Sequence, residues 1–137
     1  MRLKNKIALI AGAGSVGPGW GNGKATAVAF AREGAKVFAV DVNLDALEET
    51  HHIITSEGGA GEKLVCDVTI ANDVSKMISS CITTFGRLDI LINNVGGSVP
   101  GDPVSLEYEA WKKQLDFNLS SVFLGCKYAI PHMEKQN

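Results

Sequence analysis

The sequence predicts an α/β fold of three layers, in which a doubly wound parallel sheet carries helices on both faces. Three observations predict it. Short apolar runs of strand length alternate with longer segments whose apolar residues recur at helical spacing. These short runs are mostly apolar without alternation, as in strands that are buried on both faces. Glycines stand where the helical segments end. The order β-α-β-α-β-α-β, followed by one more helix, favours parallel strands joined by right-handed crossovers.

The individual elements follow from these patterns. Strands are expected at residues 6–11, 36–40, 63–66 and 90–93. Helices between them are expected to stop where a glycine can take the left-handed conformation. These glycines are Gly34, Gly58 and Gly86. Asp89, just before the last strand, is expected to be a surface cap.

Composition narrows the possible functions. The 137 residues carry a net charge of −2 and no basic run, so a nucleic-acid partner is not expected. No apolar run approaches the roughly 20 residues that span a bilayer, so a membrane partner is not expected either. Three widely spaced cysteines in expected strand and helix interiors favour buried thiols and a cytoplasmic location. His51 and His52 are adjacent and point about 100° apart on a helix, so no metal site is expected.

The run AGAGSVGPGWGNGKATA, which joins the first strand to the first helix, predicts a dinucleotide site. Glycines let the chain turn tightly and let a pyrophosphate approach the backbone, and the following helix offers free N–H groups. Gly12, Gly21 and Gly23 are the expected anchors. Further candidates in this turn are Gly14, Ser15 and Asn22.

Asp41 closes the second strand, in VFAVD. A carboxylate there can accept both hydroxyls of an adenosine ribose and would repel a 2′-phosphate. Neither Ser15 nor Val42 offers a compensating positive charge, so the sequence favours NAD as the cofactor over NADP. The alternative is an exposed aspartate that ends a strand and caps the next helix.

Asn93 and Asn94 end the fourth strand and are followed by Val95, Gly96 and Gly97. One amide can tie the strand to its neighbour, while the other and the glycines let nicotinamide and ribose lie close to the backbone. The sequence does not say which asparagine does which.

These residues resemble the short-chain dehydrogenase/reductase family, over essentially the whole chain and in four places. The first is the glycine turn, with the helix and strand after it. In CDVT, the resemblance places Asp67 and Val68 against the adenine ring. LDILINNVGG is similar to the family's NNAG signature, with Val95 in the alanine position. In WKKQLDFNLSSVFLG, Asn118 matches the asparagine of the catalytic tetrad.

The resemblance implies that Asn118 is catalytic, bending its helix and holding a water in a proton relay. From the sequence, Asn118 is expected on the buried apolar stripe of the last helix, where its amide needs partners. The alternative is an asparagine satisfied by neighbouring backbone. The stripe consists of Trp111, Leu115, Leu119, Val122, Phe123, Cys126, Ile130 and Met133.

The sequence departs from the family at the glycine turn, which is longer because of the inserted segment Val16 to Trp20. A longer turn resembles the divergent branch that contains enoyl-thioester reductases, whereas NNVG and Asn118 favour the main branch. Tyr108 and Lys112 spell Tyr-x-x-x-Lys, but they precede Asn118, so we interpret them as a coincidence.

The resemblance implies a Rossmann-type fold and an NAD-dependent oxidoreductase that moves a hydride between NAD(H) and a small-molecule alcohol or ketone. It also implies a homo-oligomer, a dimer or tetramer. The family's serine and Tyr-x-x-x-Lys would follow Asn137. We therefore expect residues 1–137 to be a single, incomplete dinucleotide-binding domain, truncated after the helix that follows the fourth strand and inactive alone. The alternatives are a non-catalytic dinucleotide-binding fragment and a divergent enoyl-thioester reductase.

Overall fold

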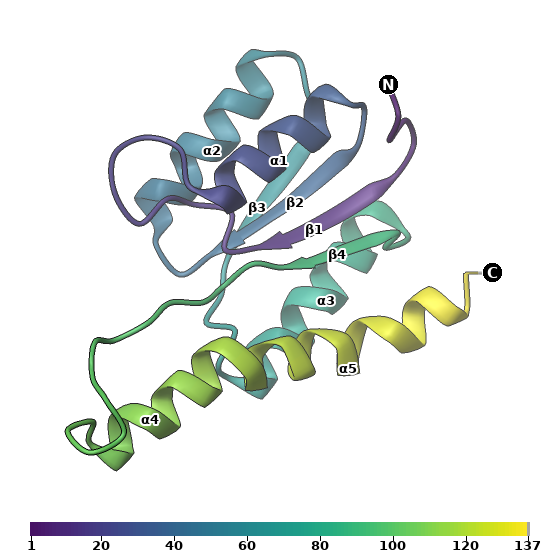
Figure 1. Ribbon diagram of the computed structural model, residues 1–137. Coiled ribbons are helices and arrows are strands. Elements are labelled where there is room, and N and C mark those ends of the chain that lie inside the picture. The colour runs from purple at the N-terminus through teal and green to yellow at the C-terminus, as the bar shows by residue number, and fades with distance from the viewer. Residues whose placement is uncertain (137) are drawn as a thin grey trace.

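The computed structural model describes residues 1–136 (Figure 1). Each expected strand and helix is present, with ends shifted by few residues. In chain order the elements are β1 (Ile7–Ala11), α1 (Asn22–Arg32), β2 (Lys36–Asp41), α2 (Leu44–Ser56), β3 (Gly61–Val65), α3 (Ala71–Phe85), β4 (Ile90–Asn93), α4 (Tyr108–Leu115), the π-helical turn η1 (Asp116–Ser120) and α5 (Ser121–Glu134).

The four strands form one parallel sheet in the order β3-β2-β1-β4. In the register of the central pairs, Leu9 lies opposite both Phe38 and Leu91. Helices α1 and α2 cover one face of the sheet, and α3 and α5 lie on the other (Figure 1). The predicted three-layer, doubly wound fold is thus confirmed.

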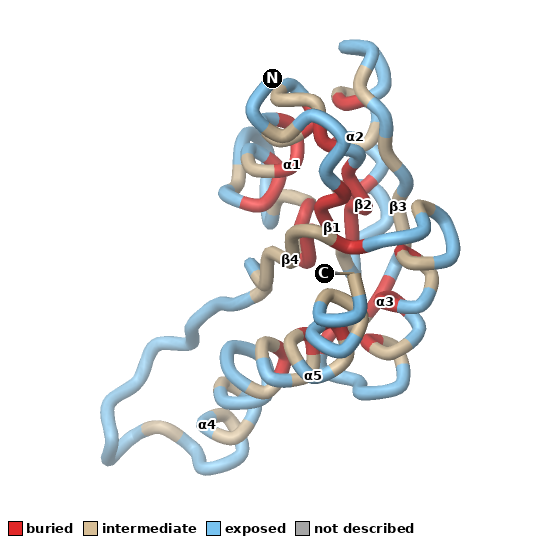
Figure 2. Tube along the Cα trace, turned by 90° about the vertical axis from the view of Figure 1, so that its right-hand side faces the viewer, coloured by how far each residue is buried: buried red, intermediate tan, exposed pale blue. Residues whose placement is uncertain are grey.

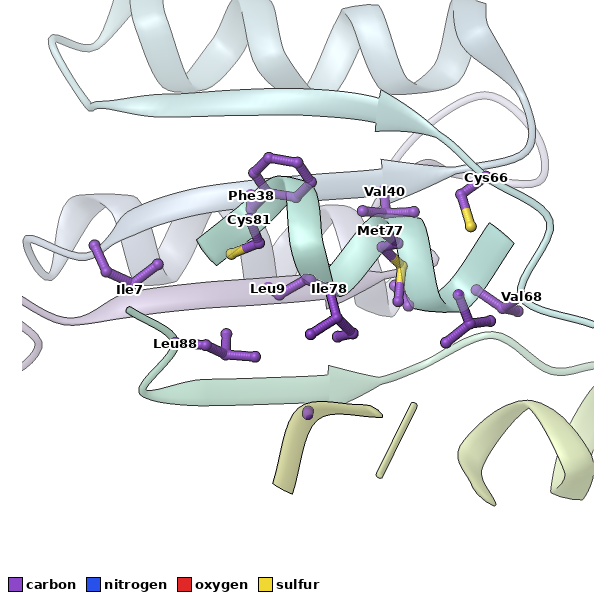
Figure 3. Packing of buried hydrophobic residues seen from close by; sticks show 13 residues of the cluster. Ile7, Leu9, Phe38, Val40, Cys66, Val68, Met77, Ile78, Cys81 and Leu88 are labelled. Carbon is purple, nitrogen blue, oxygen red and sulfur yellow. The ribbon is translucent and has the colours of Figure 1, made fainter. Parts of the chain in front are cut away.

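Alternate residues of the strands supply two separate cores. Leu9, Phe38 and Val40 pack with Met77 and Ile78 of α3, as Figure 3 shows. On the opposite face, residues such as Ile10 and Val37 pack with α1 and α2. Burial on both faces explains why β1 and β2 are apolar along almost their whole length.

The first three helices end as the glycines predict. Gly34, Gly58 and Gly86 follow α1, α2 and α3 and have φ angles of +90°, +80° and +79°. These left-handed conformations strain any residue with a Cβ, so the glycines fix where each helix ends.

The last helix differs from the expectation of a buried apolar stripe. Its buried residues are the small side chains Ser121, Gly125 and Ala129, which recur every fourth position. Small residues let α5 approach the sheet closely. Leu124, Tyr128 and Met133 pack against the core beside them, whereas other large apolar residues lie on the outside. Leu119 of η1 is 63% exposed and Phe123 of α5 is 62% exposed. Figure 2 shows how much of α4 and of the preceding loop is exposed.

Within residues 1–136, no helix combines the length and the apolar character needed to cross a membrane.

Candidate functional site

A cleft of about 610 Å³ opens at the carboxyl ends of the strands. Open α/β sheets bind ligands at this edge, where connections from neighbouring strands diverge to opposite faces. Here the strands are β1 and β4, which are neighbours in the sheet: β1 leads to α1 on one face, and β4 leads towards α5 on the other (Figure 1). The lining residues are Gly12, Gly14, Ser15, Val16, Gly21, Asn22, Gly23, Asp41, Val42, Asn43, Cys66, Asp67, Val68, Thr69, Asn94, Val95, Gly96 and Phe117.

All the candidate cofactor residues except Asn93 line this cleft. Segments far apart in the sequence meet there because β1, β2, β3 and β4 end at the same edge of a parallel sheet. Asn118 does not line the cleft, although its neighbour Phe117 does.

Three glycines of the turn, Gly12, Gly14 and Gly23, lie in close contact with neighbouring segments. A Cβ on Gly23 would overlap the carbonyl oxygen of Gly12. Gly12 has a φ of +79°, and a Cβ on it would lie 3.1 Å from Val95. A Cβ on Gly14 would lie 2.8 Å from the Cβ of Ala46. Gly14, a lesser candidate by sequence, is therefore confined like Gly12 and Gly23, and the bare backbone forms the floor of the cleft.

The carboxylate of Asp41 holds the turn from the end of β2. Its Oδ2 accepts a 2.8 Å hydrogen bond from Gly14 N, and its Oδ1 accepts a 3.0 Å bond from Asn43 N. Asn43, rather than Asp41, is the residue whose side chain caps α2, through a 3.1 Å bond from Ala46 N. The carboxylate can accept about four hydrogen bonds, so it retains acceptor sites for a ligand in the cleft.

The electrostatics of the cleft are acidic. Asp41 and Asp67 both line it, and none of the lining residues in the described part of the chain is Lys or Arg. Asp67 Oδ1 accepts hydrogen bonds from the backbone N and the hydroxyl of Thr69, at 2.9 and 2.7 Å. A ligand group with two negative charges would find no cation among these residues, whereas neutral hydroxyls would find acceptors.

Cys66 lines the same end of the cleft and is buried. Burial, followed by the charges of Asp73 and Asp67, raises the pKa of its thiol to about 11. The thiol is therefore neutral at physiological pH and is not a nucleophile there.

The structure separates the roles of the two asparagines at the end of β4. Asn94 Nδ2 donates a 3.2 Å hydrogen bond to the carbonyl of Gly12, which ties β4 to the glycine turn. Asn93 turns to the opposite face, where its Nδ2 lies 3.8 Å from Cys126 Sγ. A Cβ on Gly125 would overlap Asn93 Oδ1, so Asn93 packs directly against α5.

Asn118 is exposed, contrary to the expectation that it lies on a buried stripe. It sits in η1, where Ser121 N bonds to Asp116 O and the helix is locally widened. Its side chain is nevertheless fully partnered, as its polar character requires. Oδ1 accepts from Gly97 N at 2.9 Å, and Nδ2 donates to Gly97 O and Gln114 O, both at 2.9 Å. Asn118 therefore fastens the loop after β4 to the irregular turn of the helix.

The Tyr108/Lys112 pair lies outside the cleft. Tyr108 is 66% exposed and stacks on Trp111 at a centroid distance of 6.0 Å. Lys112 Nζ lies 4.9 Å from the centre of the Tyr108 ring. This contact is local to the first turns of α4, in agreement with its interpretation as a coincidence.

Sequence reasoning missed several residues of the cleft wall: Val16, Val42, Asn43, Cys66, Thr69 and Phe117. Most of them adjoin a predicted site residue, so adjacency was the available signal. Val16 belongs to the inserted part of the turn, for which the sequence offered no geometry.

The arrangement suits binding and orientation. Among the described lining residues, the titratable groups are two carboxylates and one neutral thiol. The helix N-terminus of α1 supplies free N–H groups beside the bare glycine backbone, which is the chemistry that holds a phosphate.

Comparison with known proteins agrees with this geometry. A family model described as short chain dehydrogenase matches residues 6–137. A crystal structure from Burkholderia xenovorans, described as a short-chain dehydrogenase/reductase, superposes with a TM-score of 0.96 at 47% identity and covers 98% of this chain and 54% of its own. An uncharacterized oxidoreductase from Thermotoga maritima is 39% identical over 99% of this chain and 51% of its own length. The 7alpha-hydroxysteroid dehydrogenase of Escherichia coli is 34% identical over 98% of this chain and 51% of its own length. The chain thus spans about half the length of the curated relatives it matches.

Proposed function

Because this chain belongs to the short-chain dehydrogenase family, we propose that it binds NAD(H) in the cleft and serves hydride transfer between that cofactor and a small-molecule alcohol or ketone. The nicotinamide carries the hydride, and the residues described above bind and orient it. In this assignment residues 1–137 form a single, incomplete dinucleotide-binding domain of the enzyme.

Asp41 is the observation that carries the choice of NAD. Its carboxylate lies at the end of β2, lines the cleft and is held by Gly14 N and Asn43 N. Fixed in this way, it can accept hydrogen bonds from ribose hydroxyls without reorganising. A 2′-phosphate at the same place would meet the carboxylate with no lining Lys or Arg to offset the repulsion.

The pyrophosphate would lie over Gly12, Gly21 and Gly23, at the start of α1, with Ser15 and Asn22 beside it. The adenine would lie against Asp67 and Val68, and the nicotinamide ribose near Asn94, Val95 and Gly96. Asn93 lies on the opposite face of the sheet and packs against α5, which supports β4 beneath this floor.

Asn118 is proposed as the catalytic residue of this half. Its amide fastens Gly97, and so holds the loop beside the nicotinamide end of the cleft. The acid–base chemistry itself we assign to residues in the part of the relatives that this chain does not span, so the 137 residues alone would bind cofactor without turnover.

The E. coli relative is named for a hydroxysteroid, and a secondary alcohol is the corresponding substrate class here. The test is steady-state oxidation of cyclic secondary alcohols by the full-length protein, with NAD⁺ or NADP⁺ as acceptor. We expect NADH formation from NAD⁺, and a loss of about tenfold or more in kcat/KM for NAD⁺ in Asp41→Asn.

Asp45→Asn is the matched control, because Asp45 is an exposed carboxylate on α2 outside the cleft. It should leave kcat/KM unchanged. Faster turnover with NADP⁺ than with NAD⁺ would contradict the cofactor assignment, whereas cofactor binding with no turnover of any alcohol or ketone would favour a binding module.

A further inference from the structure

The glycine turn contains a segment that the cofactor floor does not require. Residues 16–20 form a bulge that extends away from the strands. A Cβ added to Gly17 or Gly19 would have no neighbour within 4 Å. Val16 is fully exposed and lines the cleft. A segment with so few apolar contacts needs other interactions to hold it in one conformation.

Hydrogen bonds of Ser15 join the two ends of this bulge. The Ser15 hydroxyl donates to Gly19 O at 3.2 Å, and Gly21 N donates to Ser15 Oγ at 2.9 Å. Earlier in the turn, the carbonyl oxygen of Ala13 accepts a 2.8 Å hydrogen bond from the buried hydroxyl of Thr50 in α2. Helix α2 therefore supports the stem of the turn.

The bulge is also held by the buried ammonium group of Lys24. Lys24 stands in the first turn of α1, and its side chain is only 2% exposed. Its Nζ donates to Gly19 O at 3.2 Å and to Glu49 Oε1 of α2 at 2.5 Å. The same nitrogen lies 5.1 Å from the centre of the Trp20 ring, within the range of a cation–π contact.

Burial of an ammonium is costly unless every side of it is compensated. Here Glu49 supplies the opposite charge, but Gly19 and Trp20, both in the bulge, supply the remaining partners. Those partners are present only when the bulge keeps this one conformation. The charge on Lys24 therefore selects that conformation, and couples it to α2 through Glu49.

We propose that Lys24 is a positioning residue for the dinucleotide pyrophosphate: it braces the extended turn so that Ser15 and Val16 form the wall of the cleft above the start of α1. The inference rests on the proposed function, since it assumes a dinucleotide in that cleft. Lys24 does not itself line the cleft and acts through the turn.

The test measures dissociation constants of the full-length protein for NAD⁺, ADP and adenosine by isothermal titration calorimetry. In Lys24→Met, which keeps the length of the side chain and removes the charge, we expect binding of NAD⁺ and ADP to weaken about tenfold. Adenosine lacks the pyrophosphate and should bind equally to both proteins. Lys24→Arg should restore most of the affinity.

The matched control is Lys63→Met. Lys63 Nζ pairs with Glu48 of the same helix α2 at 2.8 Å but does not touch the turn. This variant loses an ion pair to the same helix, made by a lysine whose side chain is 30% exposed, and should bind all three ligands as the wild type does.

A second readout needs no ligand. The difference in iodide quenching between proteins with and without the substitution Trp20→Phe reports on Trp20 alone. Lys24→Met should make Trp20 more accessible to iodide, and Lys63→Met should not. If Lys24→Met fails to fold, Trp20→Leu replaces it, because it removes the ring and leaves the Lys24–Glu49 pair; NAD⁺ affinity should then fall about threefold.

The outcomes separate the two proposals. A wild type that binds neither NAD⁺ nor ADP would overturn the proposed function. A wild type that binds both, with unchanged affinity and unchanged quenching in Lys24→Met, would overturn the positioning role alone. Equal weakening of adenosine and ADP would place the effect of Lys24 away from the pyrophosphate and would also overturn it.

Discussion

At the scale of single residues, the glycine turn shows both what its sequence predicts and what it leaves open. The positions of Gly12, Gly21 and Gly23 followed from the need for a tight turn between strand and helix, and the structure finds them lining the cleft. The burial of Lys24 did not follow, because a lysine in the first turn of a helix is ordinarily solvated. Its contacts depend on Glu49 and Trp20, which only the tertiary fold brings together.

Asn118 is a second case at this scale. Its need for hydrogen-bond partners was predictable from its amide. Its exposure was not, because the apolar neighbours that were expected to form a buried stripe with it, Leu115 and Leu119, are themselves exposed.

Gly23 gives the sharpest prediction for a single residue. In Gly23→Ala, the new methyl group would overlap Gly12 O and press on Asn94 Nδ2, so the free energy of unfolding should fall by about 3 kcal/mol. Urea denaturation followed by circular dichroism measures this loss. Gly17→Ala is the control, since nothing lies within 4 Å of its added Cβ, and it should change the stability by less than about 0.5 kcal/mol. Similar stabilities for the two variants would refute the close approach of α1 to β1.

At the scale of elements, strand and helix positions were predicted best where one principle decides. Continuous apolar runs located the strands, and the glycines at 34, 58 and 86 located the helix ends. The face of α5 was predicted wrongly, because the sequence pattern ranks residues by hydrophobicity, whereas the close approach of α5 to β4 selects Ser121, Gly125 and Ala129 for their small size.

Asp89 was also interpreted wrongly as a surface cap. Its side chain is only 8% exposed, and its Oδ2 accepts a 2.8 Å bond from Ile7 N, so it joins the start of β4 to the start of β1. Burial alone would raise the pKa of Asp89, but the hydrogen bonds from Ile7 and Arg87 and the charges of Arg87 and Lys6 outweigh it and hold that pKa below its ordinary value.

A pH dependence of stability follows from this link between β1 and β4. Because the pKa of Asp89 is lower in the folded protein than in the unfolded chain, the ionised carboxylate stabilises the fold above pH 3.8, and this contribution is lost as the pH falls through the folded-state pKa. Asp89→Asn should therefore be less stable than the wild type at pH 7, and the difference should shrink below about pH 4. Urea denaturation at a series of pH values measures it. A difference that is independent of pH would show that the charge of Asp89 does not stabilise the fold.

At the scale of the whole molecule, the order β3-β2-β1-β4 leaves β4 at one edge of the sheet, and large apolar residues are exposed on η1 and α5. Exposed apolar surface of this kind marks interaction sites. The homo-oligomer implied by the family resemblance would use this surface, and the sequence alone did not place Leu119 and Phe123 on it.

Phe123 tests that assembly. In Phe123→Glu, a charge would replace an apolar side chain that is 62% exposed in the single chain, so the full-length protein should sediment as a smaller species than the wild type at the same concentration. NAD⁺ affinity should be unchanged, because Phe123 does not line the cleft. The control is Thr83→Glu, on an exposed position of α3. Unchanged sedimentation of the Phe123 variant would place the interface elsewhere.

The central claim is that this cleft binds NAD(H) and that Asp41 selects it against NADP(H). The most direct measurement is equilibrium titration of the purified protein with NADH and with NADPH, each followed by the fluorescence of the reduced nicotinamide. The account predicts saturable binding of NADH, with an affinity at least about tenfold higher than that for NADPH. Equal affinities, tighter binding of NADPH, or no saturable binding of either would contradict it.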